Sequence, residues 1–89
     1  MRKIAPTSRF RKDFRRMLKR GAKPERLAAI VEKLANDEPL PKKCRPHQLS
    51  GNWQGFCECH LAPDWLLIYQ VTDSELILVR TGSHSDLFR

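Results

Sequence analysis

The spacing of hydrophobic positions changes near residue 53. Between residues 9 and 36, apolar side chains recur at intervals of three and four, which is the spacing of one buried helix face. From residue 53 onward they alternate with polar residues or run together, which is the pattern of strands. The N-terminal half is therefore predicted to be helical and the C-terminal third to form a sheet.

Two helices are expected in the N-terminal half. The stripe of the first comprises Phe10, Phe14, Met17 and Leu18, and that of the second comprises Leu27, Ile30, Val31 and Leu34. Thr7 or Ser8 can cap the first helix, and Gly21 suits its end. Pro24 suits the first turn of the second helix, and Pro39 lies beyond its end. The short connection predicts a helix hairpin whose apolar stripes bury against another layer.

Four strands complete the expected fold. They are residues 2–6, 53–60, 65–71 and 75–82, with a proline-containing loop over residues 38–52. Alternation in residues 53–60 is expected to put Phe56, Glu58 and His60 on one face, and Trp53, Cys57 and Cys59 on the other. The fold class is thus α+β in the order β-α-α-β-β-β, with an antiparallel sheet, two helices on one face, and one domain spanning residues 1–89.

A meander of the last three strands would gather polar side chains at one end of the sheet. The turn at residues 61–64 and the end of strand 75–82 meet there, which brings together His60, Asp64, Arg80 and His84. Glu58 lies one pleat before His60 on the same face. His47, in the loop, is not placed by this argument.

This set of residues suits cleavage of RNA by its own 2′-hydroxyl. That reaction needs a base, an acid and a cation that stabilises charge on the phosphate. Histidine suits the first two roles because its unperturbed pKa is about 6.5, and arginine suits the third because its planar fork matches phosphate oxygens. Asp64 can orient a histidine, and Phe88 can stack on a base. The alternative is that these are ordinary surface, capping and core residues.

Charge supports a polyanionic partner. Residues 1–26 hold eleven Lys and Arg residues against two acidic residues, a local charge of +9 in a chain whose net charge is +7. The candidate RNA-binding residues are Lys42, Lys43, Arg45 and Gln48 in the loop, and Arg11 and Arg15 on the first helix. Solvated helix and loop faces are the alternative for all six.

The cysteines offer a competing metal site. Cys57, Cys59 and His60, with Cys44 or His47, supply soft ligands, but their spacing matches no usual zinc pattern and Cys57 and His60 point to opposite strand faces. We expect no metal and no cofactor, with the cysteines acting as small buried apolar residues. The absence of an apolar leader or membrane-spanning run predicts a cytoplasmic protein with reduced thiols.

Three motifs in residues 46–88 resemble the YafQ branch of the RelE/ParE toxin superfamily. They are H-x-L-x-G-x-W-x-G from His47 to Gly55, H-x-x-P-D-W-x-L-I-Y from His60 to Tyr69, and R-x-G-x-H-x-x-L-F from Arg80 to Phe88. The resemblance covers about half the chain, and the N-terminal half agrees in layout only. It implies a RelE-like fold.

The resemblance also implies a bacterial type II toxin. Such a toxin cuts mRNA, typically in the ribosomal A site, without a metal, and is blocked by a cognate antitoxin; we expect the toxin alone to be monomeric. Its implied catalytic positions are His47, His60, Asp64, Arg80, His84 and Phe88. Glu58 is added as an auxiliary residue only because of its predicted side of the strand. His60 and His84 would transfer protons in an order left open, and His47 would bind RNA or act as a further acid or base.

Two other functions remain open from the sequence. One is a ParE-like toxin that poisons a DNA topoisomerase, although that branch lacks the histidine set. The other is a regulatory module that binds RNA without cutting it.

Overall fold

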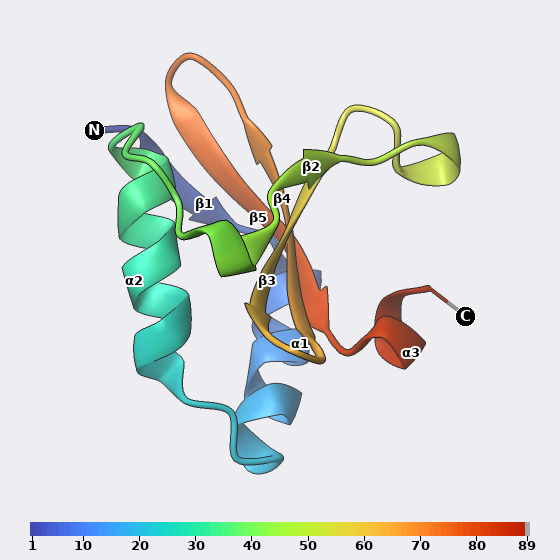
Figure 1. Cartoon of the computed structure of the whole chain (residues 1–89). Coiled ribbons are helices and arrows are strands. Elements are labelled where there is room, and N and C mark those ends of the chain that lie inside the picture. Colours follow the sequence, from blue (N-terminus) through green and yellow to red (C-terminus); the bar gives the residue numbers. More distant parts are fainter. Residues whose placement is uncertain (89) are drawn as a thin grey trace.

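Five strands form one mixed sheet in the computed structural model, which describes residues 1–88 (Figure 1). Arg89, the last residue of the predicted domain, lies outside the described residues. The strands are β1 (Lys3–Pro6), β2 (His47–Gln48), β3 (Cys57–Ala62), β4 (Trp65–Val71) and β5 (Glu75–Gly82), in the spatial order β1-β5-β4-β3-β2. The helices are α1 (Ser8–Lys19), α2 (Pro24–Ala35) and α3 (His84–Leu87), with short 3₁₀ turns η1 (Lys42–Cys44) and η2 (Gly51–Trp53).

The α+β class and the meander of β3, β4 and β5 are confirmed. The prediction of an antiparallel sheet is wrong for β1, which pairs in parallel with β5 from Lys3↔Glu75 to Pro6↔Leu78. Parallel pairing needs a long crossover connection, and the chain between β1 and β5 is long enough to supply one. The loop prediction for residues 38–52 missed β2, and the helix α3 was also not predicted.

The two long helices begin and end close to the predicted residues. The Thr7 hydroxyl caps α1 by accepting a hydrogen bond from the Phe10 backbone N–H at 2.9 Å. Gly21 follows α1 with a φ of +93°, a conformation that favours glycine. Leu18 departs from the prediction because it is exposed, whereas Asp13 is buried on the face that packs against the sheet.

Both faces of the sheet are covered by apolar side chains. The larger cluster joins α1 and α2 to alternate residues of the strands, including Cys59, Leu67 and Leu78. The smaller cluster lies on the opposite face and contains Leu66, Ile68 and Leu87, with Leu49, Trp53, Phe56 and Val79 packed against it. Trp53 was predicted on the face of Cys57, which is wrong: strand geometry starts only at Cys57, after η2 has broken the alternation.

Helix α3 closes the described chain against the end of β5. Its N-terminus is a capping box in which Ser83 accepts from the Asp86 N–H at 3.2 Å and Asp86 accepts from the Ser83 N–H at 2.9 Å. This short helix presents His84 beside the β3–β4 turn. None of the helices in residues 1–88 has the length and apolar character needed to cross a membrane.

Candidate active site

Asp64 fixes the position of His84. Its Oδ1 accepts a hydrogen bond from the backbone N–H of His84 at 3.0 Å and lies 2.8 Å from the ring Nδ1. The backbone N–H and then the ring of His84 lower the pKa of Asp64 below its ordinary value. A carboxylate at Nδ1 places a proton there, so the Nε2 atom of His84 is left to face a substrate.

His60 lies next to this pair. The ring centroids of His60 and His84 are 5.7 Å apart, and the two rings are tilted by 47°. The Nδ1 atom of His60 is buried and has no hydrogen-bond partner within residues 1–88. A neutral ring with its proton on Nε2 leaves only a lone pair at the buried position, which costs less than a buried unpaired N–H. His60 therefore presents an N–H donor to the surface.

His47 and Glu58 form a second pair across β2 and β3. The two residues are in register, and the Nε2 of His47 lies 3.7 Å from Oε1 of the buried Glu58. The Nδ1 of His47 lies 2.9 Å from the carbonyl oxygen of Arg45, an acceptor that places the ring proton on Nδ1. Glu58 and His60 are two residues apart on β3, about 7 Å along one strand face. The His47–Glu58 pair therefore lies next to His60 along the same face of β3.

The side chain of Arg80 is held by helix α1. Its Nε and Nη2 donate to the two carboxylate oxygens of Asp13 on α1, at 2.9 and 3.0 Å. This hydrogen-bonded carboxylate raises the pKa of Arg80 above its ordinary value. Asp13 also accepts from Arg16 at 3.1 Å. The prediction put Arg80 with the histidines at one sheet end. The structure fixes its guanidinium on α1, and Arg80 is not among the residues that line the hollow beside the histidines, so its role with them stays a prediction.

Phe88 follows α3 and remains partly exposed. Its ring meets Trp53 edge to face, with centroids 6.3 Å apart, and Trp53 in turn meets Phe56 in the same way at 5.8 Å. The three aromatic side chains border the surface that carries His84. Phe88 therefore has a partly exposed ring one helical turn after His84, to whose carbonyl oxygen its backbone N–H donates, rather than a place in the core.

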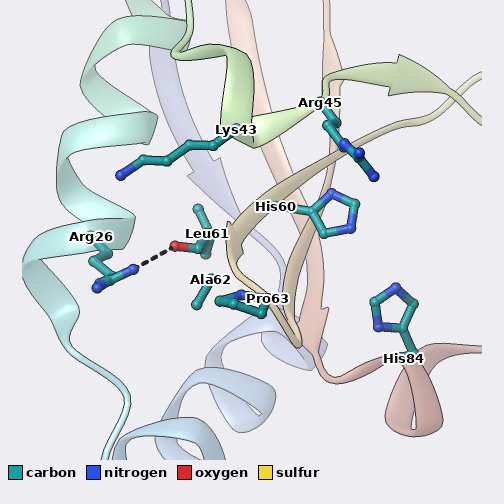
Figure 2. Close-up of a pocket in the computed structure, with 8 residues that line it drawn as sticks. All are labelled: Arg26, Lys43, Arg45, His60, Leu61, Ala62, Pro63 and His84. Carbon is teal, nitrogen blue, oxygen red and sulfur yellow. Dashed lines mark hydrogen bonds between the residues drawn. The ribbon is translucent and has the colours of Figure 1, made fainter.

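A hollow of about 480 Å³ lies beside the two histidine rings (Figure 2). Figure 2 shows Lys43 extending toward α2, which carries Arg26, while Arg45, His60 and His84 lie on the other side of the β3 ribbon. Leu61, Ala62 and Pro63 form the wall between them. The hollow therefore joins the histidine surface to a group of cations.

The predicted RNA-binding residues divide into two groups. Lys43 and Arg45 line the hollow. Lys42 and Gln48 are exposed on η1 and β2, and Arg11 and Arg15 are exposed on α1. Binding through these four stays a prediction.

The prediction missed several residues that build the site. Arg26 lines the hollow, and its only signal in the sequence was membership of the basic N-terminal segment. Helix α3 could have been found from Ser83-x-x-Asp86, a capping-box spacing. Asp86 also accepts from Arg20 at 2.7 and 3.3 Å, which ties α3 to α1. That contact spans 66 residues and has no signal in the local sequence pattern.

Comparison with known proteins decides the family. The model of the YafQ family, described as the bacterial toxin of a type II toxin–antitoxin system, matches residues 2–89. The chain belongs to the YafQ toxin family. It is 38% identical over 88 residues to the mRNA interferase toxin YafQ of Escherichia coli (strain K12), covering 98% of this chain and 96% of the relative.

Solved structures of bacterial toxins share the whole fold. A copper-bound mutant toxin from Helicobacter pylori is 43% identical with a TM-score of 0.94, covering 99% of this chain and 100% of that one. The toxin of the Escherichia coli DinJ–YafQ toxin–antitoxin complex is 37% identical with a TM-score of 0.89, covering 99% and 98%. Within residues 1–88 of the present YafQ-family chain, no three His, Cys, Asp or Glu side chains are grouped to hold a metal ion.

Proposed function

We propose that this YafQ-family toxin is an endoribonuclease that cuts mRNA by histidine acid–base chemistry. One observation carries the proposal: His84 is fixed by Asp64 through two contacts to the same oxygen, with its ring 5.7 Å from that of His60. Relatives named mRNA interferases support the substrate class. RNA, unlike DNA, supplies the 2′-hydroxyl that histidine acid–base chemistry can activate.

His47 suits the base, in place of His60, which the sequence predicted to transfer protons together with His84. With its Nδ1 proton held by the carbonyl of Arg45, its Nε2 has a lone pair that can take the proton of the 2′-hydroxyl. The carboxylate of Glu58, 3.7 Å away, then stabilises the charged ring. The freed 2′-oxygen attacks phosphorus.

His84 suits the acid. The carboxylate of Asp64 stabilises the charged imidazolium, whose Nε2 proton passes to the departing 5′-oxygen. The P–O5′ bond breaks as the P–O2′ bond forms, so the products are a 2′,3′-cyclic phosphate and a free 5′-hydroxyl. Asp64 remains ionised throughout because its pKa lies below the ordinary value.

The remaining side chains stabilise and position the phosphate. The Nε2–H of His60 and the Nη1 of Arg80, which Asp13 does not engage, donate to phosphate oxygens as charge builds on them. Phe88, exposed beside Trp53, stacks on a base next to the cut. No step of this scheme uses a metal or a cofactor.

The partners follow from the same proposal. The site is a shallow hollow on a strongly basic chain, and a ribosome that presents mRNA in its A site would supply the missing walls. A cognate antitoxin would bind and silence the toxin; the Escherichia coli relative forms a DinJ–YafQ toxin–antitoxin complex. We expect a monomeric toxin that acts in the cytoplasm, where mRNA and ribosomes meet.

Induced expression of the wild type and of His84→Ala tests the proposal. Wild type should arrest growth and yield transcripts cut at new 5′-hydroxyl ends, whereas His84→Ala should cut about 10²–10⁴-fold more slowly. Asp64→Asn keeps an acceptor for the His84 N–H but loses the charge and can impose the wrong tautomer on His84, so a loss of up to about 10⁴-fold is expected. Ser85→Ala, an exposed neighbour on α3, is the matched control and should cut like wild type.

Three outcomes would contradict the scheme. Equal cleavage by wild type and His84→Ala would remove His84 from the chemistry. Cleavage of a substrate that carries a single 2′-deoxynucleotide at the cut would exclude attack by the 2′-oxygen. Loss of cleavage on chelation would require a metal, a possibility that the copper-bound relative keeps open for test.

A further inference from the structure

We propose that Arg26 and Lys43 form a second phosphate site, which binds the RNA backbone on one side of the phosphate that is cut. The inference rests on the proposed nuclease function and deepens it. It assigns a ligand to the half of the hollow that faces α2, where neither proton transfer nor base stacking has a role.

The hollow is cationic and lacks an acidic lining residue. Arg26, Lys43 and Arg45 line it together with the two histidines and three apolar wall residues. Within residues 1–88, none of these three cations forms an ion pair, whereas Arg16, Arg20 and Arg80 are all paired with Asp13 or Asp86. Unneutralised cations converging on one hollow are the footprint of a phosphate ligand.

The edge of β3 explains why the site has two halves. β2 pairs only with Cys57 and Glu58, so within residues 1–88 β3 has β4 on one side and no strand on its other side from residue 59 onward. Successive residues of a strand point to opposite faces: His60 points toward His84, and Leu61 is buried on the side of α2. The Nη1 of Arg26 reaches the Leu61 carbonyl at 3.4 Å. An RNA chain that crosses the open edge of β3 from the histidines therefore reaches Arg26 on the other side.

A second hollow extends the path beyond Arg26. It has a volume of about 310 Å³, shares Arg26 and Ala62 with the first, and continues past Lys23 at the α1–α2 connection. The carboxylate of Asp64 also borders it, already engaged by His84. Arg26 therefore lies where the two hollows meet. An RNA chain that passes from one hollow to the other would contact it there.

An RNA strand fits this path better than an acidic peptide. The path begins at the histidine pair, so a strand cut there must continue in one direction or the other past the enzyme surface. Arginine presents a planar fork that matches two phosphate oxygens, and lysine adds a point charge. Binding of an acidic antitoxin segment is the competing outcome that the experiment separates.

RNA binding by an inactive protein tests the site without cleavage. The parent is His84→Gln, and the probe is a fluorescent single-stranded oligoribonucleotide titrated at several salt concentrations. Adding Arg26→Gln should weaken binding about tenfold at low salt and make the slope of log K against log salt shallower by about 0.7, the value for one phosphate contact. Arg26→Lys should retain most of the slope, because it keeps the charge.

Matched variants separate the site from general charge loss. Lys3→Gln removes one exposed cation at the far edge strand β1 and should leave the slope unchanged. Lys43→Gln, on a different element, should reproduce the effect of Arg26→Gln. Thermal unfolding of each variant verifies folding, and the Lys43 variant tests the site independently if Arg26→Gln is unstable.

Neutral methylphosphonates locate the phosphate. Placed one linkage at a time, such a group should weaken parent binding at one position away from the cut. At that position it should cost less in Arg26→Gln than in the parent, and nothing more in the double variant Arg26→Gln/Lys43→Gln. Additive losses at every position would overturn the site. An unchanged slope of log K against log salt in Arg26→Gln would also overturn the site. This includes the case in which the variant binds RNA normally and loses affinity only for the antitoxin. If the parent binds as expected but the wild type cuts no RNA, the nuclease proposal fails while the phosphate site stands.

Discussion

Asp13 on α1 accepts two hydrogen bonds from the guanidinium of Arg80 on β5, across 67 residues of sequence. The carboxylate side chain is 4% exposed and the arginine side chain 16% exposed, so the pair is nearly removed from water. Asp13 also lies 3.4 Å from the Thr81 N–H, beside the irregular pairing of β4 and β5 between Ile68 and Tyr69. One buried carboxylate thus joins the basic helix to the strand that leads to His84.

Asp13→Asn should be strongly destabilising. The amide places an N–H₂ group against a guanidinium and leaves Arg80 without its counter-charge, and breaking such a pair costs about 3 kcal/mol. Urea unfolding should show this loss, and a double-mutant cycle with Arg80→Met should give a coupling above about 1 kcal/mol. Glu32→Gln, at an exposed position of α2, is the control and should change stability by less than about 0.5 kcal/mol. If the effects of Asp13→Asn and Arg80→Met on the free energy of unfolding were additive, the interaction between the two side chains would contribute nothing to stability.

The cysteines are expected to be unreactive in the native protein. Burial raises the pKa of Cys59 to about 12 and also raises the pKa of Cys44 and Cys57, so little thiolate forms at pH 8. Iodoacetamide should therefore modify the folded protein slowly and the urea-unfolded protein completely, as counted by mass spectrometry. Rapid alkylation with loss of cleavage would instead place a thiol at the active surface.

Local patterns in the sequence were enough to predict most elements, but contacts across the fold were not predictable. The stripe from Phe10 to Met17 and the apolar run of β4 have the periods of their elements, and both are where they were expected. Leu18 was expected to be buried and is exposed, whereas Asp13 is buried because it binds Arg80 from a distant strand. The helical period of α1 carries no information about that contact. The meander explains why His60, Asp64 and His84 meet, whereas Arg26 joins them only through the packing of α2 against β3.

Fewer cations of the basic helix α1 are available to a ligand than its charge suggested. Arg16 and Arg20 are paired with Asp13 and Asp86, so part of the N-terminal charge holds the C-terminal helix in place. The cations still available to a polyanion include those that face outward on α1 and those around the hollow. This division of labour could not be seen from composition alone.

Stability should fall in acid through Asp86. The hydrogen bond from Arg20, followed by that from the Ser83 N–H, lowers the pKa of Asp86 below its ordinary value. A carboxyl whose pKa is lower in the folded chain stabilises the fold fully above about pH 5 and loses that contribution as the pH falls through the ordinary value of about 3.9 toward the folded one. Asp86→Asn should be less stable than wild type by about 1–2 kcal/mol at pH 7, with the gap narrowing below pH 4. Urea unfolding at pH 7, 5, 3.5 and 2.5 measures the gap; a constant gap would contradict this role.

Gly82 permits α3 to approach the end of β5. A Cβ atom at this position would lie 2.9 Å from the Asp86 Cβ and 3.0 Å from its Oδ2, so Gly82→Ala must displace the capping carboxylate. We expect a loss of about 1–3 kcal/mol, the usual cost of an overpacked site. His84 opens the same helix, so the cleavage rate should fall further than the loss of folded protein explains. Measuring cleavage at a temperature where the variant is fully folded by circular dichroism separates the two effects. Ser85→Ala, one residue along from His84, should match wild type in both measurements. A Gly82→Ala protein that is destabilised yet cuts RNA at the wild-type rate when folded would show that the position of α3 does not limit the chemistry of His84.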